Sequence, residues 1–540
     1  MSDHTLAIEQ SWKELFADGK ASAAFEKILP DYLQQMRWFG AKTGNIKQYT
    51  IENALTYEMQ NGRLAYILFV EIVFQTSNTE SYLLPVTSVN EPEAGADVIC
   101  EIQNGSGDRQ GYLVDALYDA GFRNDLFFNI QSDKQLELSI GEFIFSKGNV
   151  LDASLNESNL SSELLKLEQS NSTIIYNGEY FLKIYRKLFR DNNPDLELTQ
   201  FLSDTGDFDH SPNFAGGIEW VRKGYYRVSI GLMQERVENQ GEAWNYTLSE
   251  MEGFFQRFAD SDLSLDDFPK VDLYKPLDLD DLPENIQNLI GKKFLTRVQK
   301  LAVRTAEMHI ALFSDKTDRY FTPEPFSGDY TVWLLNRLMY MLDGRFNLLE
   351  QKVDQLKGTA REYAEYVLAN KEDIKNHILK FDEENLNSSR IRIHGDYHLG
   401  QILITGDDFC ILDFEGEPES TIRDRKVKQP PVKDLAGLCR SYHYAVFATV
   451  FNSLPENIDR ETATELGGRL YRIITGLSLE RYVETAMDNG LNIGYAKEID
   501  FLLRYHIFEK AIYEIGYELN SRPDWVIIPL KGIIQILKND

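Results

Sequence analysis

Residues 391–418 read IRIHGDYHLGQILITGDDFCILDFEGEP, and this stretch sets aspartates, histidines and one glutamine among short apolar runs. The runs ILI and FCIL have the composition of buried strands, and the Gly-Asp step at 406–407 predicts a hairpin turn between them. The run IRI leads in as a further strand. We therefore expect Asp396, Gln401 and Asp413 at one end of a hairpin.

Three readings of these polar residues are open. Mg²⁺ prefers oxygen ligands and shares its coordination with phosphates, so Gln401 and Asp413 would hold the metal while Asp396 stays free as a base. The order H-G-D-x-x-x-x-Q followed by D-F-E is similar to the kinase catalytic loop and its D-F-G segment. Alternatively, His394, Asp396 and His398 alternate on one strand face and would bind zinc or iron in a metallohydrolase. Packed, hydrogen-bonded histidines are the third reading, which we favour for His398.

Length and composition narrow the classes of function. A chain of 540 residues exceeds the size of a single hydrophobic core, so two or three domains are expected. The net charge of -29 argues against binding to nucleic acid or anionic membranes. Cys100, Cys410 and Cys439 are scattered, which argues against a disulfide framework and favours buried apolar positions. Without a signal peptide or an apolar run of about eighteen residues, the sequence predicts a soluble cytoplasmic protein that acts on small molecules.

The pattern changes twice along the chain, and it predicts an α+β fold. Residues 1–95 combine a helical start with the extended run LAYILFVEIVFQ, which indicates a small α+β unit. Residues 96–238 hold runs such as STIIYNGEYFLKIYR and predict a mostly antiparallel sheet. Residues 239–540 turn helical, as in LTRVQKLAVRTAEMHIALF. The acidic stretch 261–285 is either an ordered excursion or a mobile loop.

A candidate nucleotide-binding half precedes the hairpin. Lys183 sits inside an apolar strand, where an unpaired ammonium is costly, so a carboxylate or phosphate partner is expected. The Asn-Pro step at 193–194 supplies a cap for a helix. The first turn of this helix carries Glu197, which is the natural partner of Lys183. The segment before Lys183 takes the place of a phosphate-covering hairpin but lacks glycines. Its candidate phosphate contacts, through amides and hydroxyls, are Ser170, Asn171 and Ser172.

Several further motifs occur in order from about 160 to 530. They are EQSNSTIIY, LKIYRKL, NPDLEL, QERVENQGEAWNYTL, HGDYHLGQIL, LDFEGEP, RDRKVKQPPVKDLAGLCRSYHYA and EKAIYEIGYELNSRPDW. Together they resemble bacterial maltokinases, and QQMRWFGAKT near residues 34–43 resembles the N-terminal cap of that family. The resemblance implies a bilobal, protein-kinase-like fold of the aminoglycoside phosphotransferase type, with a cap (1–95), a β-rich N-lobe (96–238) and a helical C-lobe (239–540).

The activity that this resemblance implies is transfer of the γ-phosphate of ATP to the anomeric hydroxyl of maltose. The product, maltose 1-phosphate, would feed α-glucan (glycogen) synthesis. A kinase for another sugar such as glucosamine stays open, and a trehalose synthase partner is a family-level analogy.

The resemblance also implies roles at individual positions. Lys183 would hold the α- and β-phosphates of ATP, and Glu197 would orient it. Asp396 would be the base, and Glu415, which replaces the glycine of D-F-G, would reach a second metal or a nearby basic side chain. The residues implied for Mg²⁺ are Gln401 and Asp413, and those of a hinge that receives adenine through backbone groups are Gln234, Glu235 and Val237.

The sugar site is expected on the helix that contains FEKAIYEIGYEL. Its residues Lys510, Tyr513, Glu514 and Tyr517 recur at helical spacing and would form one polar, aromatic face. Such a face would hydrogen-bond hydroxyls and stack on a pyranose ring. The alternative is a solvated helix with an ordinary Lys/Glu pair; the matching segment of the maltokinases lines the sugar site, and this favours sugar binding. Arg304, His309 and Asp434 are expected to be structural.

Overall fold

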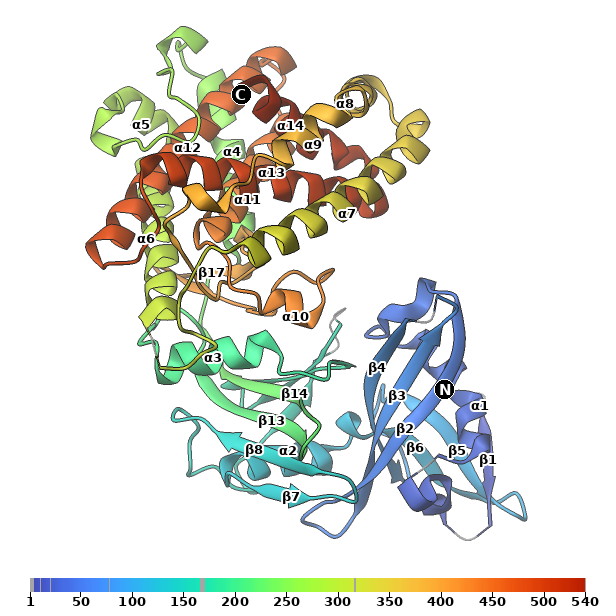
Figure 1. Cartoon of the computed structure of the whole chain (residues 1–540). Coiled ribbons are helices and arrows are strands. Elements are labelled where there is room, and N and C mark those ends of the chain that lie inside the picture. The colour runs from blue at the N-terminus through green and yellow to red at the C-terminus, as the bar shows by residue number, and fades with distance from the viewer. Residues whose placement is uncertain are drawn as a thin grey trace. The chain divides into compact units, whose positions relative to one another are not determined.

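The computed structural model describes residues 4–9, 11–19, 21–76, 78–165, 170–314 and 317–539. The chain divides into two compact units, the first made of residues 1–204 with 212–236 and the second of residues 205–211 with 237–540. Strands dominate the first unit and helices the second (Figure 1), so the α+β class is confirmed. Every helix in the described ranges is too short or too polar to span a bilayer. The three cysteines are buried free thiols, as expected.

The first sheet of unit 1 has the strand order β1-β5-β6-β4-β3-β2, with β12 paired to β4. The run LAYILFVEIVF forms β3, as predicted, and most of its side chains are buried on both faces of the sheet. The sheet continues beyond the boundary expected near residue 95 because β6 pairs with both β4 and β5. The strands are β1 Thr5–Ile8, β2 Ile46–Glu58, β3 Leu64–Phe74, β4 Thr79–Val89, β5 Val98–Asn104, β6 Arg109–Asp115 and β12 Lys187–Leu188.

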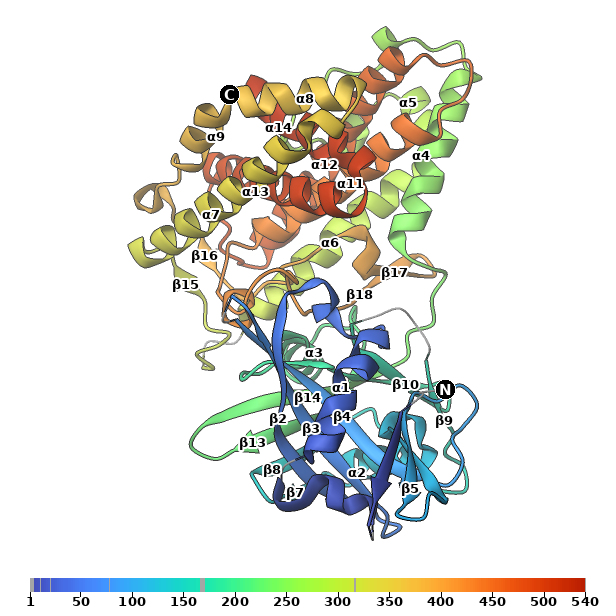
Figure 2. The ribbon, with the colours of Figure 1, turned by 90° about the vertical axis from the view of Figure 1, so that its right-hand side faces the viewer.

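Two short helical segments accompany this sheet. The predicted helical start is a 3-10 helix, Trp12–Gly19, and it is followed by α1, Ala23–Gln35. Helix α1 packs on β2 and β5 and lies along the sheet in Figure 2. Ser22 caps it, since its side chain accepts a hydrogen bond from the amide of Phe25.

The second sheet of unit 1 is antiparallel and has the order β7-β8-β13-β14-β11-β10-β9. The Asn-Gly step at 177–178 forms the predicted turn between β10 and β11, with φ values of 52° and 71°. The strands are β7 Gln135–Glu137, β8 Glu142–Lys147, β9 Ser162–Leu164, β10 Ser172–Tyr176, β11 Tyr180–Ile184, β13 Phe214–Arg222 and β14 Tyr226–Glu235. The helices of this half are the 3-10 helix Ala116–Tyr118, α2 Ala120–Gln131 and α3 Pro194–Asp204.

The two sheets of unit 1 share a hydrophobic core. One buried cluster combines Ile67 and Phe69 of β3 with Phe143 of β8 and Trp220 of β13. The ring centroids of Phe69 and Trp220 lie 4.6 Å apart. The expected cap and the β-rich half therefore form a single folded body.

Unit 2 is built around α11 and α13, which are buried on nearly all sides and pack against each other. The helix predicted from LTRVQKLAVRTAEMHIALF is α6. The helices are α4 Ala243–Ala259, α5 Glu284–Ile290, α6 Lys292–Ser314, α7 Gly328–Lys352, α8 Gly358–Ala369, α9 Lys371–Ile378, α10 Ile422–Arg425, α11 Val432–Asn452, α12 Arg460–Asp488, α13 Ala496–Ser521 and α14 Ile527–Asn539. Short 3-10 turns and the two-residue strands β15 Glu324–Pro325 and β16 Ser389–Arg390 complete the unit.

The hairpin expected around residues 406–407 is present as β17 Ile402–Thr405 and β18 Asp408–Ile411. Its first turn residue, Gly406, has a φ of 67°. The strand expected at IRI was wrong, since the chain makes only an isolated bridge there. Ile391 exchanges both backbone hydrogen bonds with Gln429, at 3.0 and 2.8 Å, and the pairing ends at this residue.

The acidic stretch 261–285 is an ordered excursion, one of the two possibilities left open by the sequence. Its Phe268 and Tyr274 are buried. Arginines of α12 and α13 donate to its backbone carbonyls, including Arg472 to Val271 at 3.4 Å and Arg504 to Leu273 at 3.1 Å. These buried and hydrogen-bonded positions fix the path of a segment that lacks helical periodicity.

Candidate active site

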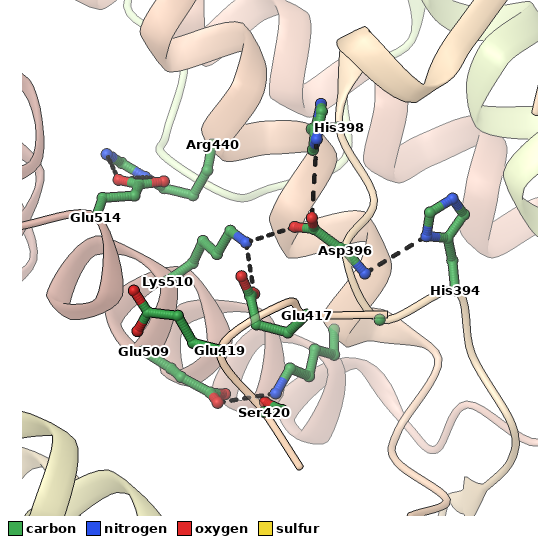
Figure 3. Close-up of polar contacts among 12 residues, drawn as sticks. His394, Asp396, His398, Glu417, Glu419, Ser420, Arg440, Glu509, Lys510 and Glu514 are labelled. Carbon is green, nitrogen blue, oxygen red and sulfur yellow. Dashed lines mark hydrogen bonds and ion pairs between the residues drawn. The ribbon is translucent and has the colours of Figure 1, made fainter. Parts of the chain in front are cut away.

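Asp396 lies in the loop between β16 and β17, and its side chain is 16% exposed. Lys510 Nζ donates to Oδ1 at 2.9 Å, and His398 Nε2 lies 3.9 Å from Oδ2 (Figure 3). Burial works against the ionised carboxylate, but the charge of Lys510 outweighs it and holds the pKa of Asp396 below its usual value. Asp396 is therefore ionised at neutral pH, which is the form that a general base requires.

Lys510 bridges two carboxylates, because its Nζ also donates to Glu417 Oε2 at 2.8 Å. Burial and the nearby charge of Asp396 raise the pKa of Glu417, although Lys510 counteracts them. Burial alone would lower the pKa of Lys510, and the two carboxylates raise it instead. Sequence reasoning missed Glu417, although it stands in the same FEGEP motif as Glu415. Asp396, Lys510 and Glu417 form the charged centre of the candidate site.

A further carboxylate that sequence reasoning missed, Glu509, lies beside this centre. Its side chain accepts hydrogen bonds from Arg337 at 2.7 Å and from Lys433 at 2.8 Å. Burial opposes its ionisation, yet Lys433 and the other neighbours hold the pKa of Glu509 well below its usual value. Glu509, Lys510, Glu417 and Arg337 line a cavity of about 40 Å³, room for a few waters or for polar groups of a small ligand.

The loop that carries Asp396 is held in place by Asp434 in the first turn of α11. Its carboxylate accepts from the amides of His394 at 2.8 Å and Gly395 at 3.0 Å. It is also 3.0 Å from Nε2 of the fully buried His309. Gly395 has a φ of 85°, which a side chain would strain. Asp434 and His309 thus make the structural contacts that the sequence led us to expect.

The metallohydrolase reading is not supported by the geometry of the histidines. His394 Nε2 donates to the carbonyl of Leu412 at 2.8 Å, and its Nδ1 accepts from the amide of Asp396 at 3.4 Å. Both nitrogens of this buried ring are therefore used within the protein. His398 Nδ1 accepts from the amide of Gly400 at 3.1 Å. Among the described residues, no cluster of three possible metal ligands contains a histidine.

The candidate magnesium ligands lie together at the end of the hairpin. Gln401 Nε2 donates to Asp413 Oδ2 at 3.0 Å, and an oxygen of Asp413 lies within 4.8 Å of one of Glu415. Asp413 has a φ of 62°, a left-handed conformation that aspartate tolerates. An amide and two carboxylates fit the oxygen preference of Mg²⁺. A basic neighbour of Glu415 is also present, since Arg425 Nη1 lies 4.0 Å from its Oε2.

In unit 1, Lys183 points from β11 to the start of α3. Its Nζ donates to Oδ2 of the buried Asp195 at 3.0 Å. The sequence pointed to Glu197 as the partner and missed Asp195, which lies in the same first turn. Asn193 caps that turn as predicted, because its Oδ1 accepts from the amide of Asp195 at 3.0 Å. The cap fixes the carboxylate of Asp195 beside the strand.

The hydroxyl of Ser172, an expected phosphate contact, is engaged within the protein. Its Oγ accepts from Nε of the buried Arg186 at 2.7 Å, and Arg186 pairs with Asp115 of β6. The hydroxyl thus belongs to a buried polar network of unit 1. Ser170 is exposed and Asn171 half-buried, while residues 166–169 of this segment lie outside the described residues.

The expected hinge residues lie where the chain passes from unit 1 to unit 2. Gln234 and Glu235 are the last residues of β14 and pair with Phe181 and Tyr180. Gln234 Nε2 donates to Thr199 Oγ1 at 3.3 Å. Val237 is the first residue of the second unit.

The expected sugar-binding face of α13 is only partly formed. Lys510 and Tyr513 lie together, with Nζ 4.7 Å from the ring centroid. Glu514 is buried and forms an ion pair with Arg440 of α11 (Figure 3), because α13 packs on α11. Its expected contact with the sugar stays a prediction. Tyr517 is 47% exposed, and the guanidinium of Arg522 lies 5.5 Å from its ring centroid.

Comparison with known proteins adds the following. Residues 32–119 match the family model of the maltokinase N-terminal cap domain. A glucosamine kinase of Mycolicibacterium smegmatis is 27% identical over 138 residues, 25% of this chain and 32% of that protein. One of Streptacidiphilus jiangxiensis is 33% identical over 147 residues, 27% of this chain and 32% of that protein. The chain thus spans about a third of the length of the curated relatives it matches.

Solved structures extend the likeness to the whole fold. A glucosamine kinase in complex with glucosamine, ADP and inorganic phosphate has a TM-score of 0.61 at 16% identity, and the match covers 98% of this chain and 100% of that chain. Crystal form B of a glucosamine kinase gives the same score, identity and coverage. This chain therefore combines a maltokinase-type N-terminal cap segment with the kinase-like fold that it shares with glucosamine kinase.

Proposed function

We propose that this protein is an ATP-dependent sugar kinase that phosphorylates maltose at its anomeric hydroxyl. The observation that carries the proposal is Asp396, a buried carboxylate kept ionised by Lys510. Its surroundings meet the needs of a base that accepts a hydroxyl proton. The match of residues 32–119 to the maltokinase cap favours maltose as the acceptor. The product would be maltose 1-phosphate, a donor for α-glucan synthesis.

In the proposed reaction, Asp396 accepts the proton of the anomeric hydroxyl as its oxygen bonds to the γ-phosphorus. The bond between the γ-phosphorus and the oxygen that bridges to the β-phosphorus breaks, and ADP leaves. Lys510 holds Asp396 in position, and Tyr513 beside it would contact the sugar. Gln401, Asp413 and Glu415 would hold Mg²⁺, which neutralises charge on the phosphates when it is bound.

Unit 1 would bind the nucleotide. Lys183, aligned by Asp195, would contact the α- and β-phosphates, and Glu197 would support it from the same helix. Backbone groups of Ser170 and Asn171 would cover the phosphates. Adenine would bind to the backbone of Gln234, Glu235 and Val237, since the side chain of Gln234 bonds within the protein.

Glucosamine is the second candidate acceptor. The observation in its favour is that the two curated relatives and the solved structures described above are glucosamine kinases. Their low identity and the short sequence coverage leave the acceptor to be measured.

The test is consumption of ATP with Mg²⁺ in the presence of maltose, glucose, glucosamine, trehalose or no sugar, with the product identified by NMR. We expect turnover with maltose and a phosphate on its anomeric carbon. Turnover with glucosamine but not with maltose would support the sugar kinase proposal and replace maltose by glucosamine as the acceptor. Sugar-independent ATP consumption at the same rate would overturn the sugar kinase proposal.

A further inference from the structure

Unit 2 contains a second, larger cavity, of about 1240 Å³. It is bordered by the first turns of α8 and α12 and by the last turns of α11 and α13, and α14 closes it with Ile527 and Lys531. None of the residues placed in the candidate active site above lines it. Its volume exceeds that of common small-molecule sites, which are about 300–1,000 Å³.

Lys531 is the buried charged residue of this cavity, with 8% of its surface exposed. Within the described part of the chain, its ammonium has no hydrogen bond or ion pair; Nζ lies 4.4 Å from the ring centroid of Phe447. Burial lowers the pKa of Lys531 to about 8, and Glu465 opposes this shift from a distance. The cavity is also lined by the basic Lys352, Lys357 and Arg460 and by the acidic Glu461, Glu465 and Asp524. An anion beside the largely buried Lys531 would be stabilised by its charge.

The start of α8 lies at the level of Lys531. Helices α8 and α14 pack together, and Lys538 Nζ of α14 is 5.6 Å from the ring centroid of Tyr366 of α8. Two turns earlier on the same faces stand Lys531 and Thr359, and both line the cavity. The two helices are therefore parallel here. The residue before α8, Lys357, makes no side-chain cap hydrogen bond. The first backbone N–H groups of α8 can therefore donate to a ligand.

We propose that this cavity binds a small molecule that carries a phosphoryl group, held by the Lys531 ammonium and the first turn of α8. A phosphoryl group has three acceptor oxygens and a charge of about -1.5 to -2, so it satisfies an ammonium and several amides together. The source is either free inorganic phosphate or a phosphorylated sugar. Tyr363 and Thr462 also line the cavity and offer an aromatic ring and a hydroxyl to a sugar ring.

The test is calorimetric titration of the full chain with inorganic phosphate and, separately, with glucose 6-phosphate. Lys531→Met removes the charge at similar length, and Lys497→Met is the matched control because Lys497 is exposed, lies in the same unit and does not line the cavity. We expect saturable binding of a probe by the wild type and the control, and at least tenfold weaker binding by Lys531→Met. Equal affinity for both probes would identify free inorganic phosphate as the ligand. Tighter binding of glucose 6-phosphate would identify a phosphorylated sugar as the ligand.

The proposal is overturned if neither probe binds, or if Lys531→Met binds as tightly as Lys497→Met. Hydrogen exchange of the wild type supplies a test that needs no variant. A bound phosphoryl group should slow exchange at the start of α8, and unchanged exchange at saturating probe would also overturn the proposal. Neither result bears on the sugar kinase reaction, so the two proposals fail separately.

Discussion

At the scale of single residues, the ammonium of Lys510 decides the charge of two buried carboxylates. It donates to Asp396 at 2.9 Å and to Glu417 at 2.8 Å. The pKa of Asp396 is lowered, whereas burial and the charge of Asp396 raise that of Glu417. One of the two acids is thus kept ready to accept a proton.

The first prediction concerns Asp396→Asn. An amide cannot accept the hydroxyl proton, so we expect kcat with the best acceptor to fall by about 10²–10⁴-fold. Binding of ATP, measured by calorimetry, should change little because unit 1 is intact. Turnover at the wild-type rate would remove Asp396 from the role of base.

The second prediction concerns Lys510→Met and uses the pH profile of kcat/KM. In the wild type the pKa of Asp396 is depressed, so activity should persist as pH falls through the ordinary carboxyl range, near about 4. Without the ammonium, burial and Glu417 both raise that pKa. We expect the acid limb of the variant to move to higher pH. Lys497→Met is the control, and an unmoved limb in Lys510→Met would contradict the proposed coupling.

The sequence predicted part of this residue-scale picture. Gln401 and Asp413 meet as the hairpin pattern implies, because the pattern is local. The pair between Lys510 and Asp396 joins residues 114 positions apart, and no periodicity encodes such a contact. For the same reason Glu417 was missed. Asp195 was missed because the first turn of α3 holds two carboxylates and the sequence reasoning named only Glu197.

At the scale of elements, α13 shows how much helical spacing alone leaves undetermined about a face. The spacing of Lys510, Tyr513, Glu514 and Tyr517 suggests one polar surface, but α13 is buried on nearly all sides. Its polar residues therefore divide among different neighbours. Lys510 contacts Asp396, whereas Glu514 contacts Arg440.

The third prediction contrasts Tyr513→Ala with Glu514→Gln. Tyr513→Ala should raise the acceptor KM more than the ATP KM, because the ring lies beside Lys510. Glu514→Gln leaves the buried Arg440 without a counter-charge and should lower the free energy of unfolding by about 3 kcal/mol. Its acceptor KM should stay close to that of the wild type. The opposite assignment of the two effects would restore Glu514 to the sugar-binding face.

The fourth prediction concerns α14 and the pH dependence of stability. The pKa of Lys531 is lowered to about 8, so between about 8 and 10 the unfolded chain binds more protons at this position than the folded chain. Its contribution to stability therefore rises with pH across this window, by up to about 3 kcal/mol. Lys531→Met should lack that rise and should be the more stable protein at pH 7. Urea unfolding at several pH values, with Lys497→Met as control, measures the difference, and parallel curves would contradict it.

At the scale of the whole molecule, long-range packing of apolar side chains decides which strands belong to one folded body. The sequence predicted the α+β class, the antiparallel sheet and the helical second half, since these depend on local patterns. It could not predict that β3 of the first sheet and β13 of the second share a core, because the two strands are far apart in the chain. The same long-range packing explains why β12 joins the first sheet.

The last prediction tests how the two sheets of unit 1 are joined. Arg186 is 1% exposed, pairs with Asp115 and stacks over Trp38, with 4.5 Å from the guanidinium carbon to the ring centroid. Arg186→Met leaves the carboxylate of Asp115 buried and unpaired, so we expect a loss of about 3–5 kcal/mol in the free energy of unfolding. Arg190 also connects the two halves, through Glu52, but its side chain is 55% exposed.

Arg190→Met is therefore the matched control, and it should cost less than about 1 kcal/mol. Chemical denaturation with and without Mg²⁺ and ATP would measure both variants and show whether nucleotide binding weakens with the loss of Arg186. Because Arg186 donates to Ser172 at the start of β10, its removal should also loosen the strand that precedes Lys183. Equal stability of the two variants would mean that apolar packing, rather than the buried ion pair, holds the two sheets together.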